Sequence, residues 1–165
     1  MATNLITQAR LKNLLHYDAD TGVFTWVYTR PKCPKNAVAG WRCKDGYTMI
    51  CLDYRIYRAH RLAWLYVYGY IPEYIDHINN IKDDNRLVNL RPATKQQNAF
   101  NTKISTSNTS KVKNVSWSKS KSKWKSYIKL NGKQIHLGYT IDFFEACCMS
   151  LSAISKYHKE FSYKS

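Results

Sequence analysis

The sequence predicts an α+β fold, in which short helices and strand-rich segments are followed by a three-stranded antiparallel sheet and a closing helix. Apolar residues recur at three- and four-residue spacing over 5–16, 58–68 and 142–157, which is typical of amphipathic helices. Alternating apolar residues between these stretches indicate strands. The dipeptides Asp45-Gly46 and Asn131-Gly132 favour tight hairpin turns between strands.

Residues 1–57 are expected to form a scaffold of one helix and several strands. The helix over 5–16 has Thr7 or Asn4 as its N-cap. Strands are predicted near 23–28, 38–41 and 47–52, where apolar and aromatic residues cluster. A second helix is predicted to begin near Arg58 and to end at Gly69.

Residues 58–101 are expected to form a second module. Two short apolar segments, 74–78 and 87–90, flank a polar loop over 79–86. Thr94 is a candidate cap for a helix that runs through Asn98. The predicted order of strand, loop, strand and helix makes a small supersecondary unit.

The chain changes composition after Asn101. Residues 102–113 are mostly Ser, Thr, Asn and Lys, so we expect an extended or flexible linker. Residues 114–165 then contain strand-like segments at 114–118, 123–130 and 133–138 and a helix over 142–157. Period-two alternation would place Lys123, Lys125, Tyr127 and Lys129 on one face, with Trp124, Ser126, Ile128 and Leu130 on the other.

The charge balance indicates a polyanionic partner. Among 165 residues, 26 Lys and Arg oppose 11 Asp and Glu, which gives a net charge of +15. Such an excess favours encounter with nucleic acid first and an anionic membrane surface second. No apolar run approaches the roughly 20 residues that a membrane span needs, and the N-terminus lacks the pattern of a signal peptide. We therefore expect a cytoplasmic protein without a membrane partner.

The five cysteines lack the paired spacing of structural zinc sites. Ordinary thiols, several of them buried, are the favoured interpretation. Zinc held by Cys33, Cys43 and Cys51 is the less favoured alternative.

Asp76, His77 and Asn98 have the chemistry needed to cut a phosphodiester. A neutral imidazole is the natural base near pH 7. Carboxylate and amide oxygens are hard donors, which suit Mg²⁺ or Mn²⁺. Adjacent residues on a strand point to opposite faces, so a bend or a different depth must bring Asp76 and His77 into one site. A position of His77 at the strand's end would relieve this difficulty.

These residues belong to a set of motifs with fixed spacings over roughly 54–101: His60-Arg-Leu-Ala-Trp64, Gly69-Tyr-Ile-Pro72, Asp76-His-Ile-Asn79, Asp84-Asn-Arg86, Asn89-Leu90 and Asn98. The set resembles the HNH, or ββα-metal, nucleases of phage intron-encoded homing endonucleases. The resemblance implies a site-specific DNA endonuclease in which Asp76 and Asn98 bind one divalent metal and His77 activates water. Asn89 would hold the His77 ring by a hydrogen bond.

The sequence departs from the family's name, because Asp76 and Asn98 stand at the two outer histidine positions. This difference argues against zinc at the cutting centre and leaves Mg²⁺ and Mn²⁺ as alternatives. Taken singly, the residues also have plainer interpretations. His60 is expected to pack or to contact a phosphate, whereas Asp84 and Arg86 brace the loop, with Arg86 also a candidate for DNA contact.

The C-terminal segment, roughly 112–158, resembles the three-stranded DNA-binding domain of plant ethylene-response factors. The residues that carry this resemblance are Asn114-Val-Ser-Trp117, Lys123-Trp124, Tyr127-Ile128, Gly132-Lys133, His136-Leu-Gly138 and Glu145-Ala146. The resemblance implies a basic sheet face that contacts double-stranded DNA. The candidate DNA-binding residues of the whole chain are Arg86, Lys103, Lys111, Lys113, Lys119, Lys121, Lys123, Lys125, Tyr127, Lys129, Lys133 and His136. The plainer alternative is a solvated lysine-rich face with Trp117 and Trp124 in the core; we favour the core for Trp124.

Two other functions share the same charge: a DNA-binding repressor or architectural protein with a vestigial nuclease centre, and an RNA-binding protein. Only the nuclease needs His77 and a metal. One centre per chain favours nicking by a monomer, while a double-strand break would need a dimer or two visits. In the scaffold, Arg30, Lys32, Lys35 and Arg42 are candidates for additional phosphate contacts.

Overall fold

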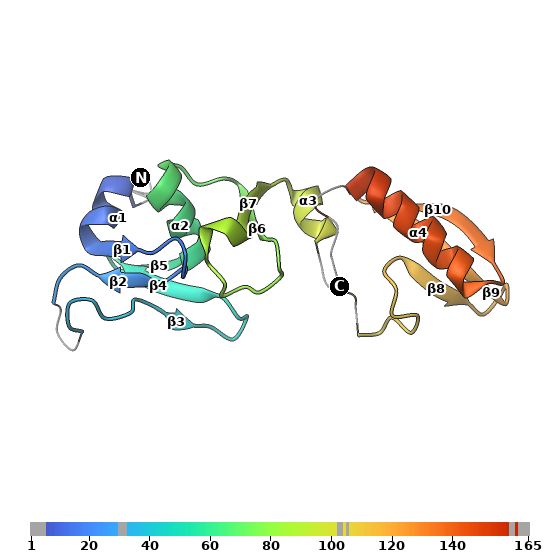
Figure 1. Ribbon diagram of the computed structural model, residues 1–165, viewed down its shortest axis with the longest axis horizontal. Helices are drawn as coiled ribbons and strands as arrows, with labels where there is room; N and C mark the ends of the chain where they lie inside the picture. Colours follow the sequence, from blue (N-terminus) through green and yellow to red (C-terminus); the bar gives the residue numbers. More distant parts are fainter. Residues whose placement is uncertain (1–5, 30–32, 102–103, 105, 159–160, 162–165) are drawn as a thin grey trace. The chain divides into compact units, whose positions relative to one another are not determined.

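The chain divides into two compact units, residues 1–93 and 94–165. The computed structural model describes residues 6–29, 33–101, 104, 106–158 and 161 (Figure 1). The predicted α+β class is confirmed, because helices and antiparallel strands occur in both units. The predicted nuclease module, 58–101, crosses the division between the units.

The first unit begins with α1 (Gln8–Leu14), and the predicted cap is confirmed, because the Thr7 side chain accepts a hydrogen bond from the backbone N–H of Arg10. Strands β1 (Leu15–Tyr17) and β2 (Phe24–Trp26) pair antiparallel. A second sheet has the order β3-β4-β5, formed by β3 (Trp41–Arg42), β4 (Thr48–Leu52) and β5 (Arg55–Arg58). The strand-rich scaffold predicted from the sequence is therefore present.

Helix α2 (Ala59–Tyr68) follows β5 directly and ends at Gly69, whose φ of 79° provides the left-handed C-cap. Strands β6 (Tyr74–His77) and β7 (Leu90–Ala93) then form a two-stranded antiparallel ribbon. The second strand starts later than the sequence predicted, because residues Leu87–Asn89 form a 3₁₀ turn, η1. Pro92 is tolerated within β7 because each strand of a two-stranded ribbon has an edge without ladder hydrogen bonds.

One hydrophobic core joins the elements of the first unit. Its buried members come from α1, the strands and α2 and are Leu11, Leu15, Tyr17, Phe24, Trp26, Ala39, Ile50, Leu52, Ala59, Leu62, Ala63, Trp64, Leu65, Ile75 and Leu90. The ribbon contributes one side chain from each strand, Ile75 and Leu90, to this core. The ribbon therefore packs on the same hydrophobic core as α2.

The second unit begins with α3 (Lys95–Phe100), which opens on a capping box formed by Thr94 and Gln97. Strands β8 (Val115–Ser118), β9 (Lys123–Leu130) and β10 (Lys133–Thr140) form a sheet in the order β10-β9-β8. Asn131 and Gly132 both have positive φ, 50° and 74°, as the predicted hairpin turn requires.

Helix α4 (Phe143–His158) lies against this sheet (Figure 1). Ser126 and Ile128 of β9 are buried together with Ala146 and Ala153 of α4. The Ser126 hydroxyl also donates to the backbone carbonyl of Ala146. The predicted division of β9 into a helix-facing face and an open face is therefore confirmed.

The segment between α3 and β8 is more ordered than the sequence predicted. The Asn108 side chain accepts from the Ser110 backbone N–H at 2.9 Å, and the buried Ser110 hydroxyl donates to the Val115 carbonyl at 2.6 Å. These bonds fold 106–113 into turns. The extended or flexible linker expected from the sequence is therefore wrong for these residues. Local Asx-type hydrogen bonds, rather than water, satisfy their backbone groups and hold them in turns.

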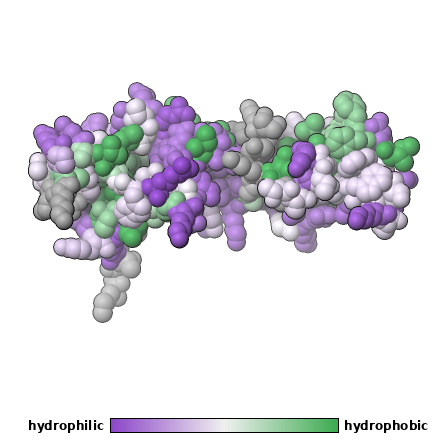
Figure 2. All heavy atoms as spheres, turned by 90° about the horizontal axis from the view of Figure 1, so that it is seen from below, coloured by the Kyte–Doolittle hydropathy of each residue, from purple (hydrophilic) through white to green (hydrophobic). Residues whose placement is uncertain are grey.

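All five cysteines are free thiols, and the prediction that several are buried is wrong: Cys51 and Cys148 are exposed, and the other three are half-buried. Within the described residues, no three His, Cys, Asp or Glu side chains come together as metal ligands. Hydrophobic residues (green in Figure 2) reach the surface of the second unit, and Ile141, Phe144 and Leu151 are among those exposed. None of the helices in the described ranges has the length and apolar character that crossing a membrane requires.

Candidate functional site

The β6–β7 ribbon places Asp76 directly opposite Arg91. The Asp76 side chain is 6% exposed and that of Arg91 15% exposed. Nε and Nη2 of Arg91 donate to Oδ2 of Asp76 at 2.9 and 2.8 Å. The carboxylate is thus held in one orientation by a charge-assisted pair, a contact that the sequence reasoning missed because it depends on strand register.

His77 is the last residue of β6, which is the strand-end position expected to let it share a site with Asp76. Its ring is buried and lies near two other rings, with centroids 4.9 Å from His60 and 6.0 Å from Tyr47. Burial lowers the pKa of His77. Hydrogen bonding to Asn85 and the nearby carboxylates of Asp76, Asp84 and Asp83 act in the opposite direction. The imidazole is therefore biased toward its neutral, basic form.

His60 lies in the first turn of α2 and is 4% exposed, which agrees with the packing role expected for it. Burial, followed by the proximity of His77, lowers the pKa of His60 to about 3. Its Nδ1 atom is buried, and none of the residues that the structure describes forms a hydrogen bond with it. His60 is therefore a neutral ring at neutral pH.

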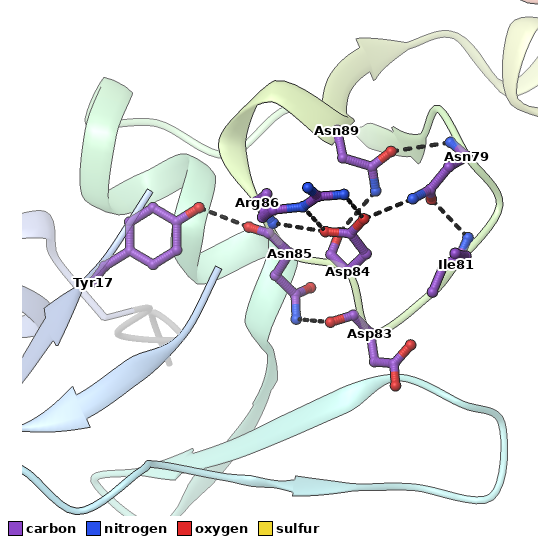
Figure 3. Close-up of polar contacts among 8 residues, drawn as sticks. All are labelled: Tyr17, Asn79, Ile81, Asp83, Asp84, Asn85, Arg86 and Asn89. Atoms are coloured by element: carbon purple, nitrogen blue, oxygen red, sulfur yellow. Dashed lines mark hydrogen bonds and ion pairs between the residues drawn. The ribbon is translucent and has the colours of Figure 1, made fainter. Parts of the chain in front are cut away.

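The loop between β6 and β7 is closed by Asn89 (Figure 3). The Asn89 Oδ1 accepts from the Asn79 backbone N–H at 3.0 Å, and its Nδ2 donates to the Asp84 carbonyl at 2.9 Å. Both polar atoms of the Asn89 amide thus hold the loop's backbone, and the expected hydrogen bond to the His77 ring stays a prediction.

Asp84 and Arg86 brace the same loop, as the plainer interpretation predicted. Nε and Nη2 of Arg86 donate to the two carboxylate oxygens of Asp84 at 2.8 and 2.6 Å, and Asn79 Nδ2 donates at 2.6 Å (Figure 3). Hydrogen bonding to Arg86 is the main cause that lowers the pKa of Asp84 to about 2. The Arg86 guanidinium stays half exposed, although its charge is already paired.

The N-terminal scaffold holds this loop from the other side, a role that sequence reasoning missed. The Tyr17 hydroxyl donates to the Asn85 carbonyl at 2.7 Å (Figure 3). The Leu87 N–H donates to the Ala19 carbonyl at 3.0 Å. A Cβ on Gly22, whose φ is 75°, would lie 2.5 Å from the backbone of Asn85 and Arg86. The glycine in the Asp20-Thr-Gly22 turn was the only sequence signal of this close approach.

The hairpin between β3 and β4 adds a third set of contacts to the loop. Arg42 forms an ion pair with Asp83 at 3.2 Å while its side chain stays 67% exposed. The Lys82 ammonium donates to the Asp45 carbonyl at 3.0 Å and lies 5.0 Å from the centroid of the Tyr47 ring. Residues far from the ribbon in sequence therefore fix the surroundings of His77.

Asn98, the second expected metal ligand, lies on α3 in the second unit and is exposed. The first unit thus brings together Asp76, His77 and the loop held by Asn89, while Asn98 is positioned by the Thr94 capping box. The carboxylate of Asp76 and the side-chain amide of Asn98 each offer hard oxygen donors. This chemistry fits Mg²⁺ or Mn²⁺ better than a soft metal.

The open face of the second unit's sheet carries five of the candidate DNA contacts: Lys123, Lys125, Tyr127, Lys129 and His136. Pairing places Gln134, His136 and Tyr139 of β10 opposite Lys129, Tyr127 and Lys125 of β9, so these side chains share one face with Lys123. The Lys121 ammonium lies 4.1 Å from the Tyr139 ring centroid, and Lys119 is exposed. Lys133 pairs with Leu130, which places it on the opposite, helix-side face.

The candidates before β8 have different positions. Lys113 donates through Nζ to the Phe100 carbonyl at 2.6 Å, and burial lowers the pKa of its ammonium. The ammonium thus joins α3 to the turn segment, and its expected phosphate contact stays a prediction. Lys111 is exposed. Lys103, Arg30 and Lys32 lie outside the described residues.

Three comparisons show which known proteins the chain is similar to. Residues 57–100 match the family model described as HNH endonuclease. The chain is 40% identical over 83 residues to Protein 3.8 of Escherichia phage T7, covering 49% of this chain and 69% of that protein. It is also similar to the solved structure titled "DNA binding and cleavage by the HNH homing endonuclease I-HmuI", at 27% identity with a TM-score of 0.41. That match covers 52% of this chain and about half, 49%, of the other.

Proposed function

We propose, from the premise that the chain belongs to the family of phage T7 Protein 3.8 and carries an HNH endonuclease domain, that it is a metal-dependent, site-specific DNA endonuclease of the homing type. The observation that carries the proposal is the buried pair of Asp76 and His77 at the end of β6. A carboxylate held by Arg91 and a buried imidazole follow one another in the chain there. That arrangement supplies a metal ligand and a general base to one phosphodiester.

In the proposed mechanism, His77 accepts a proton from the water that attacks the phosphorus, and the bond to the 3′ oxygen breaks in line with the attack. Burial keeps the imidazole neutral before the reaction, so it is ready to accept that proton. Asp76 and Asn98 would hold one Mg²⁺ or Mn²⁺ ion, which supplies charge neutralisation at the phosphate and the leaving oxygen. Asn89 acts indirectly, by holding the backbone of the loop that follows His77.

We further propose that the open face of β8–β10 supplies affinity and sequence choice on double-stranded DNA. Lys123, Lys125 and Lys129 project from this face beside Tyr127 and His136. Lysines there would contact phosphates, and a few side chains would read base edges in the major groove. Tethering two modules raises the effective concentration of each for DNA held by the other.

The test is cleavage of a mixture of phage genomic DNA fragments by the full chain with Mg²⁺, with Mn²⁺ and with EDTA. We expect metal-dependent cuts at few positions by the wild type and by His16→Ala, a control at an exposed histidine of β1. His77→Ala should bind the same fragments and leave them intact. Binding without cleavage by the wild type would show a DNA-binding protein with a vestigial centre and would refute the nuclease proposal.

A further inference from the structure

The Asn89 amide holds the loop backbone, whereas the His77 ring meets the Asn85 side chain and the rings of His60 and Tyr47. A general base needs a fixed ring, because its nitrogen must point at the attacking water within hydrogen-bond reach. The groups that contact the His77 ring therefore determine where its nitrogen points. The inference below rests on the proposed nuclease function of this site.

His60 packs directly on His77. The two ring centroids are 4.9 Å apart and the ring planes meet at 78°, an edge-to-face arrangement that aromatic pairs prefer. His60 is held in turn by its position in the first turn of α2, beside the buried Ala59 and Leu62. We propose that His60 is a positioning residue that holds the His77 ring in its reactive orientation through this contact.

The ring of Tyr47, directly before β4, lies near both His60 and His77. Its ring centroid lies 5.4 Å from that of His60 and 6.0 Å from that of His77, so the three rings form one cluster. Tyr47 is itself held between two cations, with the Arg58 guanidinium carbon at 4.4 Å and the Lys82 ammonium at 5.0 Å from its ring centroid. The cluster thus joins the hairpin before β4, the start of α2 and the end of β6.

His60 suits this role because it stays neutral. A protonated neighbour would repel the charge that His77 acquires when it accepts the water's proton, whereas a neutral ring does not. The edge-to-face contact also determines which side chains can replace His60. A flat aromatic ring can reproduce an edge-to-face contact, while an aliphatic side chain of similar volume cannot.

The experiment compares His60→Phe, which keeps a ring, with His60→Leu, which removes it, both in the full chain. His158 offers a matched control, since it is also 4% exposed, has a buried Nδ1 with no partner and stacks on Phe100, but lies in the second unit. His158→Leu should leave kcat on saturating DNA within about twofold. His60→Leu should lower kcat by about tenfold or more with little change in KM, and His60→Phe should recover most of the loss.

Histidine ring NMR spectra of the full chain give a readout that does not depend on cleavage. The shift that a neighbouring ring imposes on the His77 ring protons should disappear in His60→Leu and persist in His60→Phe. If His60→Leu fails to fold, Tyr47→Leu removes the other, half-exposed ring and should show a smaller change of the same kind. Unchanged His77 signals or an unchanged kcat in His60→Leu would overturn the inference, as would equal losses in the Leu and Phe variants.

Failure of this inference is distinguishable from failure of the nuclease proposal. If the wild type does not cleave, the nuclease proposal falls, while the NMR comparison still decides whether His60 restrains His77. If the wild type cleaves and His60→Leu cleaves equally well, only the positioning role falls.

Discussion

The buried ion pair between Arg91 and Asp76 allows a quantitative prediction. Replacing Arg91 by Met leaves the Asp76 carboxylate, 6% exposed, without the guanidinium that donates to it at 2.8 and 2.9 Å. Removing one partner of a buried pair costs roughly 3–5 kcal/mol, because the remaining charge stays desolvated. Since Arg91 is itself 15% exposed, we expect the lower end, about 3 kcal/mol.

The assay is a double-mutant cycle on the metal-free full chain, with Arg91→Met, Asp76→Asn and the double variant. Urea unfolding followed by tryptophan fluorescence gives the free energy of unfolding of each protein. The double variant should recover much of the loss, because it removes both the cation and the buried charge.

Arg10 and Asp53 provide a matched control pair, with similar distances of 3.1 and 2.9 Å but side chains that are 53% and 49% exposed. Solvent screening should make the coupling of that pair much smaller. A coupling between Arg91 and Asp76 no larger than that of the control pair would refute the reasoning. The Arg91→Met variant should also bind Mn²⁺ about tenfold or more weakly in calorimetry, because this is the usual cost of losing a partner that orients a metal ligand.

Four further outcomes are expected. Because burial lowers the pKa of His77, cleavage should rise and level off below the pH of about 6.5 at which an ordinary histidine titrates; a midpoint at or above that value, with constant DNA binding, would contradict this. The pKa of His60 is about 3 when folded, so the unfolded chain binds the extra proton first, and stability should fall as pH decreases from about 6.5 toward 3. His60→Phe should flatten that slope in urea titrations. Asn89→Ala should increase amide exchange across 79–84, because both of its bonds hold that backbone; unchanged exchange would refute its bracing role. Lys125→Ala should lower the slope of log K against log salt by about one, whereas Lys113→Met should leave the slope unchanged and lower stability, because its ammonium is bonded to Phe100.

Local signals in the sequence predicted most elements of the fold. Thr7 and Thr94 cap helices through their own side chains, Gly69 ends α2, and Asn131-Gly132 turns the hairpin of β9 and β10. Each signal acts within a few residues, so neighbouring residues are sufficient to specify it. The alternation in β9 similarly predicted which side chains α4 covers.

The site was predicted less completely, because its contacts join distant residues. Asp76 and His77 were found by residue type and spacing, but the pairing of Asp76 with Arg91 needed the register of the ribbon. Asn89 was assigned to the imidazole because both are catalytic by resemblance, whereas its amide is committed to the loop backbone. Lys113 was assigned to phosphate because it is a lysine in a polar segment, and only the folded chain brings the Phe100 carbonyl to it.

The fastening of the β6–β7 loop to the scaffold has a consequence for protein engineering. A graft that transplants only the stretch matching the HNH model, 57–100, would leave behind Tyr17, Gly22 and Tyr47, which hold the loop and enclose the base. Such a chimera would carry the motif without the scaffold residues that hold the loop and surround His77. For the proposed nuclease, a transplantable unit would therefore begin at α1 and include both N-terminal sheets, and the proposed DNA-binding sheet would be exchanged at a position beyond α3.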